Sequence, residues 1–147
     1  MKNKLLLLFP LTIFLFSCTA KKESTSTNSN SIQVIEAAYS YWTSGIKSGG
    51  EGTEFAVKLV SNADNLQIDS LYIGDNVLKT ISKPSTGSKF FDIKKIQYSK
   101  GDTVIVRASA KSKLKIDSKN ILKCVVNNST IMVELKNMKE SKTKAYK

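Results

Sequence analysis

Histidine is absent from the 147 residues of the sequence, and this absence excludes more chemistry than any motif that is present. Without imidazole the chain cannot build a Ser/His/Asp or Cys/His nucleophile system. Nearly every zinc, copper or non-haem iron site also uses histidine ligands. The composition therefore predicts a protein that is not an enzyme, with no catalytic residue, no metal site and no cofactor.

Cysteine is scarce as well, since the sequence contains only Cys18 and Cys124 and therefore has no disulfide framework. Cys124 alternates with Leu122 and Val126 in the segment LKCVV, which is the parity of a core-facing strand residue. A buried free cysteine packs as a small hydrophobic side chain. We therefore expect Cys124 to lie in the core, while Cys18 belongs to a different motif.

Arginine is nearly absent, because Arg107 is the one arginine among 23 basic residues. Only this side chain offers the planar, bidentate grip that suits carboxylate and phosphate groups. Residues 79–147 hold seventeen basic and five acidic side chains, whereas residues 18–78 hold four and seven. The positive field of the protein therefore belongs to the C-terminal half of the chain.

A long apolar run occurs only near the N-terminus, where two lysines precede the segment 5–16. This run is shorter than the ~20 residues that a membrane-spanning helix needs. It ends in Leu15-Phe16-Ser17-Cys18, which resembles the lipobox of bacterial lipoproteins. The resemblance implies a signal peptide over residues 1–17, cleavage before Cys18 and acylation of the Cys18 thiol.

The same resemblance implies an exported protein that is lipid-anchored to the cell envelope, and we expect the outer membrane. Two or more acyl chains on one residue give stable anchoring. Residues 18–31, rich in serine, threonine and asparagine, are predicted to form a flexible tether. One domain is then expected over residues 32–140, followed by a basic tail at 141–147.

Apolar residues of the predicted domain recur at every second position, as in strands with one face on a core. Clear examples are the segments 55–59, 104–110, 114–116 and 131–135. The pattern predicts an all-β fold, a single antiparallel β-sandwich that is Ig-like or a partly open barrel. Residues 32–44 also fit a helical stripe, so a short helix stays open there beside the favoured strand.

Turn residues separate the predicted strands. Gly74-Asp75-Asn76, Lys100-Gly101-Asp102 and Asn127-Asn128 include residues that tolerate the positive φ of tight turns. Changes of parity predict β-bulges near Asp69-Ser70 and Lys94-Lys95. The glycine-rich segment 45–52 lacks the lysine and hydroxyl of a phosphate-binding loop, so it predicts a bend between two strands.

A row of basic side chains is the first candidate for a binding site. If residues 107–115 stay extended, they place Arg107, Lys111, Lys113 and Lys115 on one face, with neighbours two positions apart separated by ~6.6 Å. Such a row can meet polyanions, or it can be a plain solvated sheet face. It lacks the interleaved aromatic residues that stack bases, so no nucleic-acid partner is expected.

Aromatic residues form the second candidate. Tyr39, Tyr41 and Trp42 can provide a sugar-stacking platform or can pack in the core. Four carboxylates are candidates for a catalytic acid and base, but no two of them have a spacing that would bring them together. We expect all four at solvated surface positions. These carboxylates are Glu51, Glu54, Asp64 and Asp69.

Three segments, YWTSGIKSGGEGTEFAVKL, IDSLYIGD and VVNNSTIMVELKNMKE, resemble in this order a group of small exported Bacteroidota proteins without an assigned activity. The resemblance implies a β-rich exported domain. The sequence thus predicts a non-catalytic, lipid-anchored protein that binds an envelope partner or is an accessory of an envelope assembly. The alternative is a ligand-binding domain whose basic sheet face holds acidic glycans or phosphorylated lipids. The oligomeric state stays open.

Overall fold

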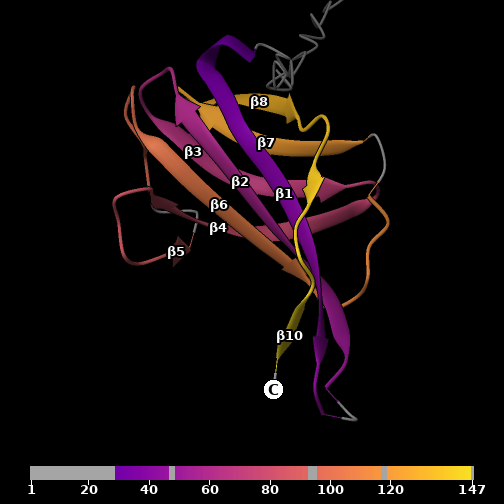
Figure 1. Ribbon diagram of the computed structural model, residues 1–147. Helices are drawn as coiled ribbons and strands as arrows, with labels where there is room; N and C mark the ends of the chain where they lie inside the picture. The colour runs from indigo at the N-terminus through magenta and orange to yellow at the C-terminus, as the bar shows by residue number, and fades with distance from the viewer. Residues whose placement is uncertain (1–28, 47–48, 93–95, 117–118, 147) are drawn as a thin grey trace, which may run out of the picture.

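The computed structural model describes residues 29–46, 49–92, 96–116 and 119–146 (Figure 1). Apart from a 3-10 turn at Ser29–Ser31, the regular elements in these ranges are strands, so the predicted all-β class is confirmed. The strands are β1 (Ile32–Ser44), β2 (Glu51–Ser61), β3 (Leu66–Ile73), β4 (Asn76–Pro84), β5 (Phe91–Asp92), β6 (Thr103–Ala110), β7 (Asn120–Val126), β8 (Ser129–Glu134), β9 (Lys139–Glu140) and β10 (Lys144–Tyr146).

These strands form one curled, mixed sheet, a half-barrel, in the order β10-β1-β2-β6-β4-β3-β7-β8 (Figure 1). Strand β4 joins the two halves, because residues 76–79 pair with β3 and residues 80–84 pair with β6. Strands β9 and β10 pair with β1 in parallel. The finer prediction of an Ig-like sandwich of two antiparallel sheets is therefore not confirmed.

Residues 32–44 form a strand and not a helix. Strand β1 pairs antiparallel with β2 from Ile32 to Thr43, with a shift of register between Val34 and Glu36 that the sequence did not indicate. The predicted bulge near Asp69-Ser70 is confirmed by a register shift between Ile68 and Ser70. The bulge predicted at Lys94-Lys95 lies outside the described residues.

The predicted turns have the expected backbone conformations. Asn127 and Asn128, which connect β7 to β8, have φ values of 48° and 65°. Gly74, between β3 and β4, has a φ of 55°. The glycine-rich segment joins β1 to β2, and the Ser44 amide donates to the Gly50 carbonyl oxygen at 3.0 Å. The glycines therefore mark a bend between strands, as the sequence predicts.

The core lies on the inner face of the curled sheet. Cys124 is fully buried there, as predicted from its parity, and burial, followed by the charge of Asp69, raises the pKa of its thiol. Tyr98 is also buried and its hydroxyl donates to Ser82 Oγ at 2.8 Å. Other core side chains are Phe55, Val57, Leu59, Leu66, Ile68, Leu71, Ile73, Val104, Val106, Leu122, Ile131 and Val133.

Two predicted boundaries differ from the structure. The strand predicted at 114–116 does not form, because β6 ends at Ala110 and the following chain bonds to the Thr53 side chain. Thr53 Oγ1 accepts from the Leu114 amide at 2.9 Å, which replaces a ladder hydrogen bond. The sheet also extends beyond residue 140, since β10 occupies part of the segment expected as a basic tail.

Candidate functional site

An open groove of about 510 Å³ crosses the outer face of β1, β2, β6 and β4. The register places Ala38 beside Ala56, Ala56 beside Arg107, and Arg107 beside Ile81. Ala38 and Ala56, which we call the alanine floor, leave space because methyl side chains barely rise above the backbone. The hollow therefore results from two small residues that meet across the consecutive strands β1 and β2.

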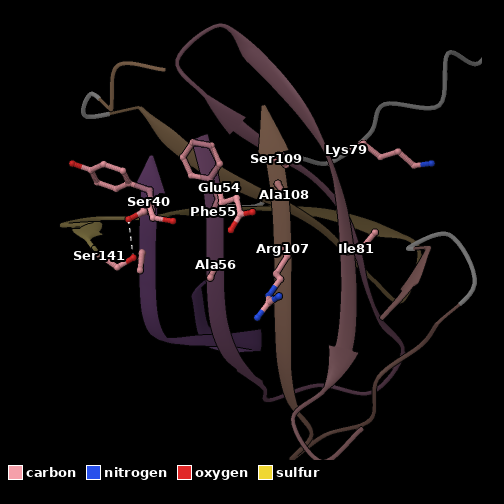
Figure 2. Close-up of a pocket in the computed structure, with 12 residues that line it drawn as sticks. Ser40, Glu54, Phe55, Ala56, Lys79, Ile81, Arg107, Ala108, Ser109 and Ser141 are labelled. Atoms are coloured by element: carbon pink, nitrogen blue, oxygen red, sulfur yellow. Dashed lines mark hydrogen bonds between the residues drawn. The ribbon is translucent and has the colours of Figure 1, made fainter. Parts of the chain in front are cut away.

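A second row of residues crosses the same strands one step along the sheet. Ser40 pairs with Glu54, and Glu54 pairs with Ser109, so a hydroxyl flanks the carboxylate on each side. We call these three residues the polar row. Ser40 is only 4% exposed as a residue, but its hydroxyl, which makes no hydrogen bond within the described ranges, keeps contact with solvent. Figure 2 shows Glu54 and Arg107 projecting from neighbouring strands, while Lys79 points away from Arg107.

The two sides of the groove are formed by segments that lie far apart in the sequence. On the β1 side, Ser141 follows β9, and its amide and hydroxyl donate to the Tyr39 carbonyl oxygen at 2.8 and 3.0 Å. On the β4 side, Lys79 and Ile81 line the groove, and outside it the centroid of the Phe90 ring lies 4.8 Å from Arg107 Cζ. This cation–π contact orients the guanidinium beside the alanine floor.

Basic side chains gather next to the groove. Lys58 and Lys83 both pair with Ile105, two residues from Arg107 on the same strand face. Lys83 Nζ lies 5.0 Å from the centroid of the Phe90 ring and donates to the Gly87 carbonyl oxygen at 2.8 Å. We call Lys58, Lys83 and Arg107 the basic patch.

The basic patch replaces the row predicted along one strand. Only Arg107 lies in β6, and the other three predicted residues follow in the irregular segment 111–116 because β6 ends at Ala110. Lys113 lies over the Tyr41 ring at 4.6 Å, away from Phe90. Lys111 and Lys115 are exposed. The structure therefore does not bring the four predicted residues together on one strand.

The three aromatic residues do not form one platform, because alternate residues of a strand face opposite sides. Tyr39 and Tyr41 lie on the inner side, with ring centroids 5.6 Å apart at an angle of 73°. Trp42 faces the other side and covers Gly52. Burial, followed by the Glu140 carboxylate, raises the pKa of Tyr39, whose hydroxyl donates to Glu140 at 3.3 Å.

The acidic residues singled out from the sequence lie in separate places. Asp69 pairs with Lys123 at 3.1 Å, and Asp64 accepts from the Lys100 amide at 3.0 Å. Glu54 lies in the groove, whereas Glu51 starts β2. In the described part of the chain, no group of three or more acidic or cysteine side chains is placed to hold a metal ion.

Sequence reasoning missed most of the groove. The alternation of apolar and polar residues in β2 was enough to place Ala56 and Lys58 on the same face of the strand. No local signal shows that Ala38, Ile81 and Lys83 of other strands lie on this same face of the sheet. Neither the alanines nor the serines resemble a motif. Only the strand order reveals them.

Comparison with known proteins found no matching family model, curated protein or solved structure. Among the residues that the structure describes, none belongs to a helix long and apolar enough to cross a membrane. Cys18 and the lipobox lie outside the described ranges. The groove and its chemistry therefore carry the functional argument.

Proposed function

We propose that this protein is a non-catalytic binding module of the bacterial cell envelope, lipid-anchored to the outer membrane through Cys18. Its groove holds the ligand, or the part of an envelope partner, that it recognises. The observation that carries this proposal is the hollow over the alanine floor, lined by the polar row and Arg107. A concave surface with an apolar floor and a few convergent polar groups is the usual form of a binding site.

The lipobox resemblance supports the anchor. If Cys18 is acylated, the Cys18→Ser variant loses the lipid and leaves the membrane fraction, while the unaltered chain stays there. Fractionation of cells, together with labelling by a radioactive fatty acid, measures both effects. Membrane attachment of the Cys18→Ser variant would contradict the anchor, and the groove would keep its own test.

The groove is tested by crosslinking in intact cells. A photoreactive amino acid in place of Ser109, which is exposed at the groove, is expected to yield an adduct with the ligand. Ala56→Trp fills the hollow without touching the core and is expected to abolish the adduct. Ser129→Trp, on the exposed end of β8, is the matched control and should leave the adduct intact. An adduct that survives Ala56→Trp would refute the groove as the binding site.

A second candidate function is the binding of polyanions by the outer sheet face, and the basic patch favours it. Lys58 and Lys83 lie about 10 Å apart across Ile105, since neighbouring strands are separated by ~4.8 Å. Acidic glycans or phosphorylated lipids can bridge two charges at this spacing. The patch thus joins Lys83 and Arg107 of the C-terminal half with Lys58 of the N-terminal half.

Retention on heparin tests this candidate. Lys58→Glu is expected to lower the salt concentration at which the protein elutes, because it reverses a charge of the patch. Lys111→Glu makes the same charge change in the exposed segment after β6 and serves as the control. Equal shifts for the two variants would show that net charge, and not the patch, determines retention.

A further inference from the structure

We propose that the groove binds an acidic saccharide, with a uronic-acid carboxylate on Arg107 and sugar hydroxyls along the polar row. This inference rests on the proposed binding function and specifies its ligand. It combines three features of the groove: an oriented guanidinium, serine hydroxyls on either side of a carboxylate, and a flat apolar floor. Each feature selects a different part of the ligand.

Arg107 selects a carboxylate. Its guanidinium is oriented through its contact with Phe90, and in the described part of the chain it forms no salt bridge. Planar guanidinium binds a carboxylate through two parallel hydrogen bonds, which are short and charge-assisted. Lys58 and Lys83 add positive charge beside it without offering this fork. The charge of the site therefore complements an anionic group at the Arg107 end of the groove.

The polar row selects hydroxyl groups. Ser40 lines the groove, and its hydroxyl makes no hydrogen bond within the described ranges and keeps contact with solvent, so a ligand can reach it. Glu54 next to it accepts hydrogen bonds and repels anions. A sugar hydroxyl donates to Glu54 and accepts from Ser40, whereas a phosphate only accepts. This pairing disfavours a phosphate group at the polar row.

The alanine floor selects a flat apolar surface. Cross-strand neighbours are ~4.8 Å apart and residues of one face recur every ~6.8 Å, so the floor and polar row cover roughly 10 by 7 Å. The C–H face of a pyranose ring can lie on Ala38 and Ala56 while its hydroxyl edge meets the polar row. An extended peptide would instead need free backbone groups, and β2 and β6 are paired on both sides.

Calorimetric titration of the full-length chain, processed in a bacterial host, tests the proposal with short oligogalacturonate. We expect binding at about 0.15 M salt and at least tenfold weaker binding of the uncharged methyl ester. Arg107→Met should weaken oligogalacturonate binding tenfold or more, and Arg107→Lys by less, because lysine keeps the charge without the fork. Lys111→Met removes one charge outside the groove and should change the affinity less than twofold. Ser40→Ala should weaken binding about threefold.

Three results would overturn the proposal: no binding of oligogalacturonate, equal affinity for its methyl ester, or an equal loss in Lys111→Met. Tighter binding of polyglutamate would identify an acidic peptide as the ligand instead. Tighter binding of phosphatidylglycerol vesicles would identify anionic lipid. The proposed binding function has its own test in each of these cases. If Ala56→Trp still abolishes the crosslinked adduct, the groove is a binding site and only the choice of ligand is wrong. If the adduct survives Ala56→Trp, both the binding site and the ligand are wrong.

Discussion

Gly52 permits the close packing at the end of the sheet, and replacing it with alanine should destabilise the protein. A Cβ at this position would lie 2.2 Å from the Ala110 carbonyl oxygen and 2.4 Å from Trp42 Cε2. Even the close C–H···O contacts of sheets keep carbon and oxygen about 3.3 Å apart. The added methyl group therefore overlaps by about 1 Å with a backbone atom that cannot rotate away.

The size of the effect follows from two opposing contributions. Overpacking of this kind costs up to about 3 kcal/mol of the free energy of unfolding, because the backbone must shift. Replacing glycine with alanine also restricts the unfolded chain, which returns about 1 kcal/mol. The net loss is about 2 kcal/mol, which lowers the midpoint of urea unfolding by about 1 M at an m-value of about 2 kcal/mol per M.

Urea unfolding followed by tryptophan fluorescence measures this loss directly, because Trp42 is the single tryptophan of the chain and covers Gly52. Gly87→Ala is the matched control. Its Cβ would lie 3.3 Å from the Pro84 carbonyl oxygen, so a small adjustment suffices and the midpoint should change by less than about 0.3 M.

A double-mutant cycle, with urea unfolding followed by circular dichroism because Trp42→Leu removes the single tryptophan, separates the two overlaps. Trp42→Leu combined with Gly52→Ala removes the clash with the indole and leaves the clash with Ala110. The coupling between the two substitutions should therefore be favourable by about 1 kcal/mol. A Gly52→Ala protein as stable as the unaltered one, with the same emission maximum, would refute the reasoning.

Three further predictions concern the interior and the turns. Burial raises the pKa of the Cys124 thiol above its ordinary value of 9.0, so the thiol should not react with Ellman's reagent until the protein unfolds. In the unfolded chain the Cys124 thiol ionises near pH 9, whereas in the folded protein it stays protonated. The free energy of unfolding should therefore be independent of this thiol below about pH 9 and decrease above it, which urea unfolding at several pH values can measure. Tyr98→Phe removes the 2.8 Å hydrogen bond to buried Ser82 and should cost about 1 kcal/mol in urea unfolding; no cost would mean that Ser82 finds another partner. Asn128 has a φ of 65°, so Asn128→Ala should lower the thermal midpoint while Asn128→Gly should not, and equal midpoints would contradict the turn geometry.

The periodicity of the chain was sufficient to predict much of the local structure. Alternation of apolar side chains predicted β2, β6 and β8, and placed Cys124 on the inner face, because the two faces of a strand follow directly from parity. The turn residues Gly74 and Asn127-Asn128 were predictable for the same local reason, since positive φ favours glycine and asparagine.

Local signals failed where side chains from elsewhere intervene. The apolar alternation at 114–116 resembles a strand, yet the Thr53 side chain bonds the Leu114 amide and the ladder stops at Ala110. Tyr39, Tyr41 and Trp42 were predicted from the sequence as one aromatic candidate, but strand alternation places Trp42 on the face opposite the two tyrosines, and their neighbours depend on β2 and the C-terminal strands.

The sequence by itself determined which residues face outward, including Arg107, since a strand's alternation is written in its own residues. Only the tertiary structure decided that Arg107 lies between Ala56 and Ile81, and that Lys58 and Lys83 lie beside it. Strand order and register depend on how all the apolar faces bury one another at once. That collective packing, and not any motif, created the groove.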